Sequence, residues 1–186
     1  MNLRQQIEQY TPFNAQETKD QQMLLRYMDT FDNLLTRENE FAHFTASAWL
    51  VNDDFSKVLM VYHNIYQSWS WVGGHADGDA DLLQVALKEA KEETGLSKIS
   101  PVSEDIYSLE ILGVPAHEKK GKHVATHIHL NVTYLLQASE NEPIQIKADE
   151  NSDIRWFGLN DAIEASTEPE MKVVYRKLNH KLKNLL

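Results

Sequence analysis

A glycine pair followed by a glutamate-rich helix is the most constraining feature of this sequence, and it occupies residues 71–96. At Gly73 and Gly74 the absence of a side chain allows the backbone to approach a ligand closely. Asp81, with a glutamine three residues later, has the spacing of a helix capping box. Apolar residues then recur at helical intervals and predict one buried face: Leu82, Leu83, Ala86, Leu87 and Ala90. Gly95 stands where a left-handed residue would end the helix.

The other face of this helix carries Glu89, Glu92 and Glu93, spaced at i, i+3 and i+4. Like charges at these spacings repel each other, at a cost of roughly 0.2–0.5 kcal/mol per pair. Most glutamate-rich helix faces are simply solvated. Oxygen ligands beside a glycine turn are, however, what Mg²⁺ prefers, together with water and substrate phosphates. The combination of turn, cap and glutamates therefore favours a metal site over a solvated face.

This arrangement resembles the signature of the Nudix (MutT-like) hydrolases, G-x5-E-x7-R-E-U-x-E-E-x-G-U, in which U is a bulky aliphatic residue. The matching positions are Gly74, Glu89, Glu92, Glu93, Gly95 and Leu96. Three positions differ: Ala80 replaces the first glutamate, Lys88 replaces the arginine, and Ala90 is a small residue at the first U. Lys88 keeps the charge but lacks the bidentate fork with which arginine would orient a glutamate.

The resemblance implies a Mg²⁺-dependent hydrolase, with Mn²⁺ as a substitute, that cleaves a diphosphate linkage in a nucleoside diphosphate derivative. The implied metal ligands are Glu89, Glu92, Glu93, the Gly74 carbonyl and Glu150. Many family members have a further acidic residue in a loop before a Trp-Phe strand. Glu150, ahead of Trp156, fits that position best, and Asp149 is second; an ordinary solvated loop is an equal alternative.

Catalytic roles are implied for Glu89 and Glu92, either of which could deprotonate the attacking water. Family members differ in which residue is the base, so both remain open. We expect Lys88 to orient one of these glutamates, or else to point into solvent.

Two other functions remain open. The departures at Ala80 and Lys88 are compatible with a degenerate Nudix module that binds nucleotides without hydrolysing them, although the three retained glutamates argue against it. Isopentenyl-diphosphate isomerase shares the Nudix fold but relies on a cysteine, and this chain contains none.

Aromatic and histidine side chains are the candidates for substrate contact: His75, Trp71 and His127. His127 and His129 share one face of a predicted strand, because side chains alternate. A His-x-His pair can bind zinc. We expect a pocket wall instead, because there is no cysteine and the glutamates prefer a hard cation. His117 and His123 are expected near the same cleft.

Composition limits the partners. A net charge of -10 over 186 residues argues against a nucleic-acid binder, which needs clustered Lys and Arg. A small-molecule diphosphate substrate is still compatible, since a metal supplies local positive charge. There is no apolar run for a membrane span and no signal-peptide pattern, so a cytoplasmic protein is expected.

Hydrophobic periodicity predicts the order of elements. Residues 1–39 are expected to form a helical extension and residues 40–186 the main domain with a C-terminal helix. The extension carries an apolar stripe suited to core or homodimer contacts: Met23, Leu24, Tyr27, Met28, Phe31, Leu34 and Leu35. Strands are expected at 44–51, 57–63, 105–117, 123–138 and 154–157, with helices from Leu159 and over 169–182. Four residues of the last helix should face inward: Val173, Val174, Leu178 and Leu182.

This order resembles the Nudix fold. The implied fold class is α/β, an α/β/α sandwich with a mixed β-sheet, here with an N-terminal helical extension.

Overall fold

A mixed eight-stranded sheet forms the centre of the computed structural model, which describes residues 1–119, 121–147 and 151–185. The strands are β1 Ala42–Val51, β2 Lys57–His63, β3 Ser68–Ser70, β4 Val72–His75, β5 Ile99–Pro101, β6 Ser108–Val114, β7 His117–Lys119, β8 Lys122–Val124, β9 His127–Ala138 and β10 Asn151–Gly158. The main order is β10-β2-β1-β9-β5, while β3 pairs with β2, β4 with β1 and β6 with β9. β1 and β9 run parallel, and the other neighbours are antiparallel.

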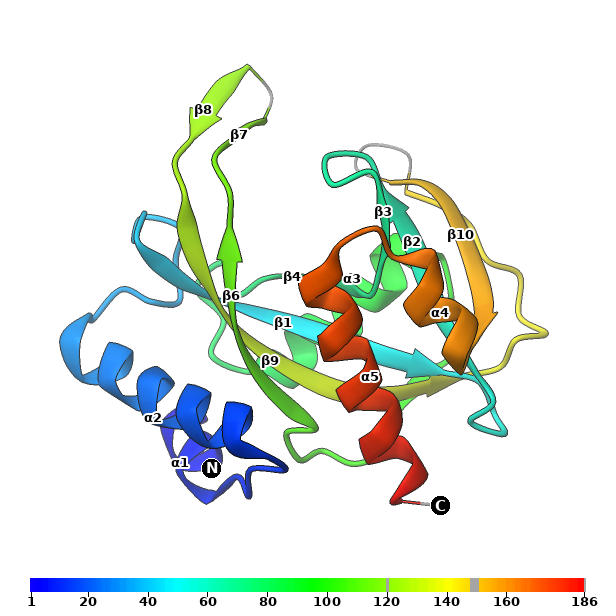
Figure 1. Cartoon of the computed structure of the whole chain (residues 1–186), viewed down its shortest axis with the longest axis horizontal. Coiled ribbons are helices and arrows are strands. Elements are labelled where there is room, and N and C mark those ends of the chain that lie inside the picture. Colours follow the sequence, from blue (N-terminus) through cyan, green and yellow to red (C-terminus); the bar gives the residue numbers. More distant parts are fainter. Residues whose placement is uncertain (120, 148–150, 186) are drawn as a thin grey trace.

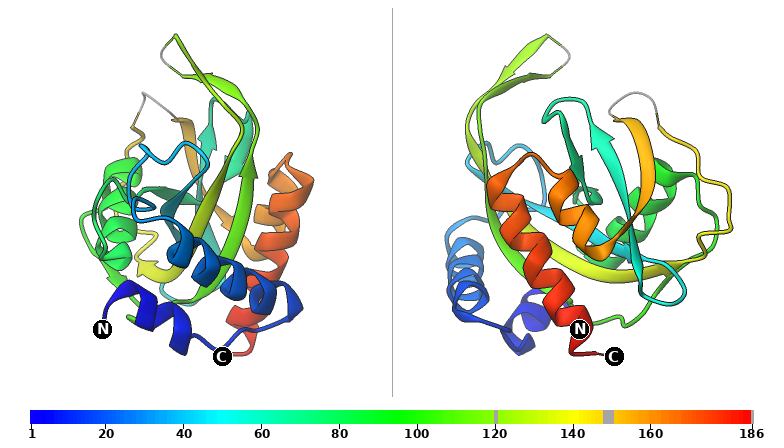
Figure 2. Two further views of the ribbon diagram at one scale, coloured as in Figure 1. Left: turned by 90° about the vertical axis from the view of Figure 1, so that its left-hand side faces the viewer. Right: turned by 45° about the vertical axis from the view of Figure 1, so that its right-hand side comes forward.

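Helices cover both faces of this sheet, as the predicted sandwich requires (Figures 1 and 2). The helices are α1 Leu3–Gln9, α2 Ala15–Thr30, α3 Leu82–Thr94, α4 Leu159–Ala165 and α5 Pro169–Lys183. α1, α2 and α3 contribute to one core cluster, and α4 and α5 contribute to a second. Within the described residues, no helix is long and apolar enough to cross a membrane.

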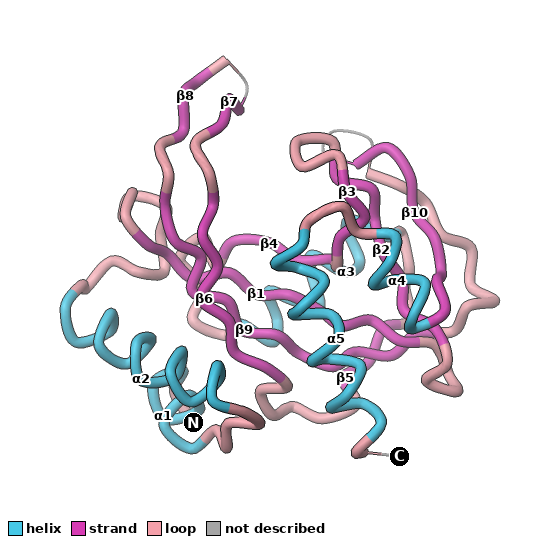
Figure 3. Tube along the Cα trace, in the orientation of Figure 1, coloured by secondary structure: helices cyan, strands magenta, loops and turns pink. Residues whose placement is uncertain are grey.

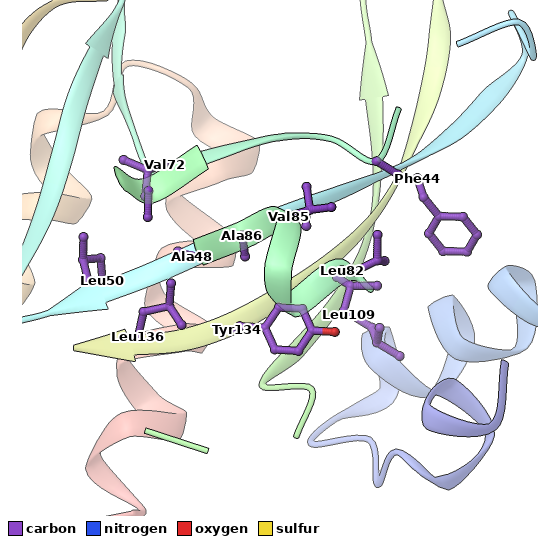
Figure 4. Packing of buried hydrophobic residues seen from close by; sticks show 14 of the residues in the cluster. Phe44, Ala48, Leu50, Val72, Leu82, Val85, Ala86, Leu109, Tyr134 and Leu136 are labelled. Carbon is purple, nitrogen blue, oxygen red and sulfur yellow. The ribbon is translucent and has the colours of Figure 1, made fainter. Parts of the chain in front are cut away.

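β1 is the strand around which both cores are built, and all ten of its residues are buried. Successive side chains of a strand point to opposite faces. The even-numbered side chains of β1 are apolar and belong to the same core cluster as α3, and Figure 4 shows Phe44, Ala48 and Leu50 in that cluster. The odd-numbered face begins with polar residues and becomes apolar at Trp49 and Val51, which join the core beneath α5.

The predicted helix of the signature is α3, and its two ends are closed as expected. The Asp81 side chain accepts a hydrogen bond from the Gln84 N–H at 3.2 Å. At the other end Gly95 has φ 71°, a left-handed conformation that costs glycine little. The fully buried face includes Val85, which the apolar periodicity omitted.

The N-terminal segment is helical, but α2 ends at Thr30, earlier than the apolar stripe predicts. Asp32 and Asn33 follow, and their short polar side chains favour turns over helix. Leu34 and Leu35 therefore lie in the loop before β1, although Leu34 is still buried there. Leu3, Ile7 and other residues of the extension belong to the same core as the sheet, so the division at residues 39 and 40 stays a prediction.

The C-terminal helix α5 has the predicted extent, but one predicted inward residue is wrong. Val173 is 63% exposed, whereas Met171, Tyr175, Leu178 and Leu182 are buried. The buried face is thus centred on Tyr175, whose ring stacks against Trp49 of β1 with the centroids 5.2 Å apart.

The two long predicted strands over 105–117 and 123–138 are each interrupted. The breaks fall between β6 and β7 and between β8 and β9, and the first contains Pro115, which has no N–H for a ladder hydrogen bond. β7 and β8 consequently form a separate two-stranded sheet that projects beyond the main body (Figure 3).

The outer edge of β6 is covered by side chains of α2. Gln16 donates to the Leu109 carbonyl at 3.0 Å, and the Ile111 N–H donates to the Asp20 carboxylate at 3.0 Å. Unpaired backbone groups at a sheet edge otherwise attract other strands. Side chains of α2 therefore cover the unpaired edge of the sheet at β6.

A buried ionic network joins α2, α5 and β6 at the same edge. The Glu17 carboxylate lies 3.2 Å from Lys177 Nζ and 3.1 Å from Lys181 Nζ, and it accepts hydrogen bonds from Tyr10 and Ser108. Burial alone would raise the pKa of Glu17. The hydrogen bond from Tyr10 and the charge of Lys177 outweigh it and lower the pKa to about 2.

Candidate active site

The candidate site lies where β4 contacts α3. A Cβ atom built on Gly74 would lie only 2.4 Å from Glu89 Cδ and 2.6 Å from Glu89 Oε1. The space that an ordinary side chain would occupy is therefore filled by the Glu89 carboxylate. This is the close backbone approach for which the glycine pair was singled out.

Glu93 is buried behind this contact, with 7% of the residue exposed, and both of its oxygens accept hydrogen bonds. The Gly73 N–H donates to Oε2 at 3.0 Å, and Asn151 Nδ2 donates to Oε1 at 3.1 Å. A buried carboxylate needs such partners, because an uncompensated buried charge is costly. The two donors fix the orientation of Glu93.

Glu92 has a different environment from its two neighbours. It is exposed, and its oxygens lie 3.9 Å from Lys88 Nζ and 3.4 Å from Lys147 Nζ. Lys88 is itself 69% exposed. A contact of this length between exposed groups orients Glu92 only weakly, worth at most about 1 kcal/mol.

A cavity of about 480 Å³ opens beside Glu89. Its lining is mostly polar: His75, Ala76, Asp77, Asp79, Gln84, Val85, Lys88 and Glu89. Glu89 lines this cavity and contacts Gly74, and the adjacent Gly73 N–H holds Glu93. Carboxylate oxygens are ligands that suit a hard cation such as Mg²⁺. The predicted ligand Glu150 and its alternative Asp149 lie outside the described residues.

A second, larger hollow of about 740 Å³ lies between α1 and the end of α5. Its lining includes Tyr10, Phe13 and Lys181 and none of the predicted site residues. The chemistry predicted from the sequence therefore belongs to the smaller cavity.

Trp71 is half-buried, and its ring meets Tyr175 edge-on with the centroids 5.7 Å apart. This contact belongs to the core beneath α5, so a role for Trp71 in substrate binding stays a prediction. Trp69 packs in the same core against Phe157, with the centroids 4.8 Å apart.

His75 and His127, the other predicted substrate contacts, lie in one cluster with His43 and His129. The ring centroid of His43 lies 5.1 Å from His75, 4.9 Å from His127 and 5.2 Å from His129. His117 is more peripheral, at 6.3 Å from His127, and His123 is exposed on the β8 strand of the projecting hairpin.

Burial lowers the pKa of His43 and, with the neighbouring charge of His75, lowers the pKa of His129 to about 2. Both rings are therefore neutral at physiological pH. Neutral imidazoles can accept hydrogen bonds or bind a metal ion.

Two residues of this region have no signal in the local sequence. Asn151 reaches Glu93 across 58 positions of the chain, and His43 meets His129 only through the parallel pairing of β1 and β9. An alternating pattern in residues 42–51 places His43 on the polar face of its strand, but only the strand register shows which residues it meets.

Comparisons with known proteins agree with this fold. A model of the NUDIX domain matches residues 41–178. The bis(5'-nucleosyl)-tetraphosphatase [asymmetrical] of Rattus norvegicus is 24% identical over 110 residues, which cover 59% of this chain and 68% of the relative. The Sus scrofa protein of that name is 26% identical over 121 residues, covering 64% of this chain and 76% of the relative.

Solved structures show the same fold. A C. elegans Ap4A hydrolase binary complex superposes with a TM-score of 0.57 at 24% identity, over 76% of this chain and 98% of that one. The Nudix hydrolase RenU from M. Smegmatis also reaches 0.57, at 15% identity, over 77% of this chain and 88% of that one.

Proposed function

Because this chain belongs to the Nudix family, we propose that it is a pyrophosphohydrolase that cleaves a diphosphate linkage in a nucleoside diphosphate derivative with Mg²⁺. The observation that carries the proposal is the placement of Glu89 and Glu93 against Gly73 and Gly74. The two carboxylates contact neighbouring residues of β4 there, and Glu89 also lines a polar cavity. Mn²⁺ is the expected substitute.

The metal would be held by Glu89, Glu92, Glu93 and the Gly74 carbonyl, where it would neutralise phosphate oxygens and lower the pKa of a bound water. Glu93 is already oriented by the Gly73 N–H and by Asn151, so its carboxylate needs little reordering. Such preorganisation lowers the cost of binding charge in the transition state.

Proton removal from the attacking water needs a carboxylate that reaches into the cavity. Glu89 lines the cavity, whereas the Glu92 oxygens face Lys88 and Lys147. Glu89 is therefore the better placed of the two candidate bases. Lys88 lines the same cavity, so it can also contribute positive charge towards a substrate phosphate.

Dinucleoside polyphosphates are the nucleoside diphosphate derivatives to test first. The relatives that carry a tetraphosphatase name support this choice, and so does the fold shared with the C. elegans hydrolase. ADP-ribose, nucleoside triphosphates and nucleotide sugars complete the panel. The homodimer and the cytoplasmic location stay predictions.

The second candidate function is a nucleotide-binding module without turnover. Ala80 and Lys88 favour it, because one carboxylate and one bidentate donor of the signature are missing. Glu89 and Glu93, held in the geometry described above, favour hydrolysis.

The deciding experiment is a hydrolysis screen of the purified chain on that panel with Mg²⁺ or Mn²⁺. Glu93→Gln should lower metal-dependent turnover by orders of magnitude, because it removes one anionic ligand while it keeps the size of the side chain. Glu170→Gln, at an exposed position at the start of α5, is the matched control and should keep full activity. Full activity in Glu93→Gln would reject the metal assignment. Nucleotide binding with no turnover on any substrate would select the binding module.

A further inference from the structure

Four histidines from three strands meet on the side of the sheet opposite the glutamates. They are His43 of β1, His75 of β4, and His127 and His129 of β9. Adjoining ring centroids lie 4.9–5.2 Å apart. One nitrogen each from His43, His75 and His129 can be chosen so that all three lie within 4.8 Å of one another.

Strand register brings these rings together. His43 and His129 are direct neighbours in the parallel ladder of β1 and β9. His75 is paired with Thr45, which points to the same face of β1 as His43. Gly74, the residue before His75 in β4, faces the other way, towards Glu89. The histidines and the glutamates therefore lie on opposite faces of one short strand.

Backbone carbonyls fix the protons of two rings. His43 Nδ1 lies 3.0 Å from the Asn39 carbonyl, and His127 Nδ1 lies 2.9 Å from the Ala125 carbonyl. A carbonyl can only accept, so each Nδ1 must carry a hydrogen, and in the neutral ring each Nε2 has a free lone pair. His129 Nε2 then donates to His127 Nε2 across 3.1 Å, which leaves the lone pair of His129 on Nδ1.

The lone pair on His43 is the unexplained part of this arrangement. His43 Nε2 is buried and has no hydrogen-bond partner among the described residues. A buried acceptor without a partner costs about 1–3 kcal/mol. Histidines that bind metals commonly donate their other N–H to a backbone carbonyl, as His43 does to Asn39.

We propose that His43, His75 and His129 form a binding site for a transition-metal ion, with Zn²⁺ as the expected ion. Three imidazoles and an open fourth position are a common zinc arrangement, and nitrogen donors select zinc over Mg²⁺. Zinc–nitrogen bonds of about 2.0–2.1 Å require the nitrogens to lie roughly 3.4 Å apart. Zinc binding would therefore draw the three rings closer together than the observed spacing of up to 4.8 Å.

The sequence alone suggests only a pocket wall for His127 and His129. The structure adds His43 of β1 to the histidines of β4 and β9, so that ligands from three strands meet. This site is separate from the proposed Mg²⁺ site, since its ligands are nitrogens on the other face of β4. His75 nevertheless also lines the cavity of Glu89, so a bound zinc ion would adjoin the proposed reaction site. The inference does not rest on the proposed hydrolysis.

The test is zinc binding by the full chain after treatment with a chelator, measured by calorimetric titration in saturating Mg²⁺. Elemental analysis after desalting gives the stoichiometry. One equivalent of zinc is expected. His129→Gln should weaken Zn²⁺ binding by more than about 100-fold, because losing even an outer-shell partner typically costs 10–100-fold. His180→Gln, an exposed histidine on α5, is the matched control and should bind as the natural chain does.

Glu93→Gln separates the two sites, since it should lose Mg²⁺-dependent turnover and keep zinc. His75→Gln is the second variant, for use where circular dichroism shows that His129→Gln does not fold. His75 is half-buried, as His129 is, and its variant should also lose zinc. The proposal is overturned by no zinc uptake in the natural chain, by unchanged uptake in the histidine variants, or by uptake that depends on Glu93.

Discussion

Gly73 and Gly74 are adjacent in β4, yet a methyl group added to each would meet a different obstacle. At Gly74 it would meet the Glu89 side chain, 2.4 Å away, which can move. At Gly73 it would meet the Ala46 carbonyl at 2.6 Å and the Ser47 Cα at 2.8 Å, which belong to the buried backbone of β1. One glycine therefore makes room for a functional carboxylate, and the other allows two strands to approach.

Gly74→Ala should lower metal-dependent turnover more than it lowers stability, because it displaces Glu89 from the cavity wall. Gly73→Ala should destabilise the fold by about 1–3 kcal/mol, the usual cost of overpacking. Denaturant unfolding and turnover of each variant, measured side by side, check the contrast. Equal loss of stability in both variants, with the activity of Gly74→Ala retained, would contradict it.

At the scale of elements, Glu17 shows how the N-terminal helices are tied to the domain. Its pKa of about 2 lies below the ordinary value of 4.5. A carboxylate with a lowered folded-state pKa stabilises the fold fully above the unfolded-state pKa. That stabilisation is lost as the pH falls from about 4.5 towards 2.

Glu17→Gln should therefore destabilise the protein most at neutral pH, by about 3–5 kcal/mol, because Lys181 and Lys177 lose a buried partner. The difference in the free energy of unfolding between this variant and the natural chain should be smaller at pH 3. Glu8→Gln, which removes an exposed i,i+4 pair with Arg4, is the control and should change stability by less than about 0.5 kcal/mol at both pH values. Urea unfolding of both variants and the natural chain at pH 7 and pH 3 measures these differences. If the difference in the free energy of unfolding between Glu17→Gln and the natural chain were the same at both pH values, ionisation of Glu17 would not be its cause.

The sequence predicted some helices more accurately than others. α3 was predictable to its ends because its cap, apolar face and terminal glycine are all local signals. The contact of Glu89 with Gly74 follows from the same stretch. The predicted inward face of α5 was partly wrong, because Val173 is exposed and the buried face contains Tyr175, which stacks on Trp49. His43 and Asn151 were missed because their partners are far away in the sequence.

For the molecule as a whole, Mg²⁺ should act as a stabilising ligand, because the glutamate site is assembled only in the folded state. At 100 times its dissociation constant, a ligand of this kind adds about 2.7 kcal/mol to the free energy of unfolding. For a chain of this size the melting temperature should rise by about 5–10 °C. Glu93→Gln should abolish the rise, and KCl at equal ionic strength should not reproduce it. Thermal melts that are identical with and without Mg²⁺ would count against the site.

The parallel pairing of β1 with β9 also sets the order in which the chain can fold during synthesis. Thr45 and Asn131, which are hydrogen-bonded across that ladder, are 86 positions apart. A ribosome therefore releases β1 long before its longest partner exists. Until β9 emerges, one side of β1 has no strand to pair with, and exposed edges of this kind are prone to aggregation. The nascent chain thus passes through an interval in which binding by a chaperone would protect it most.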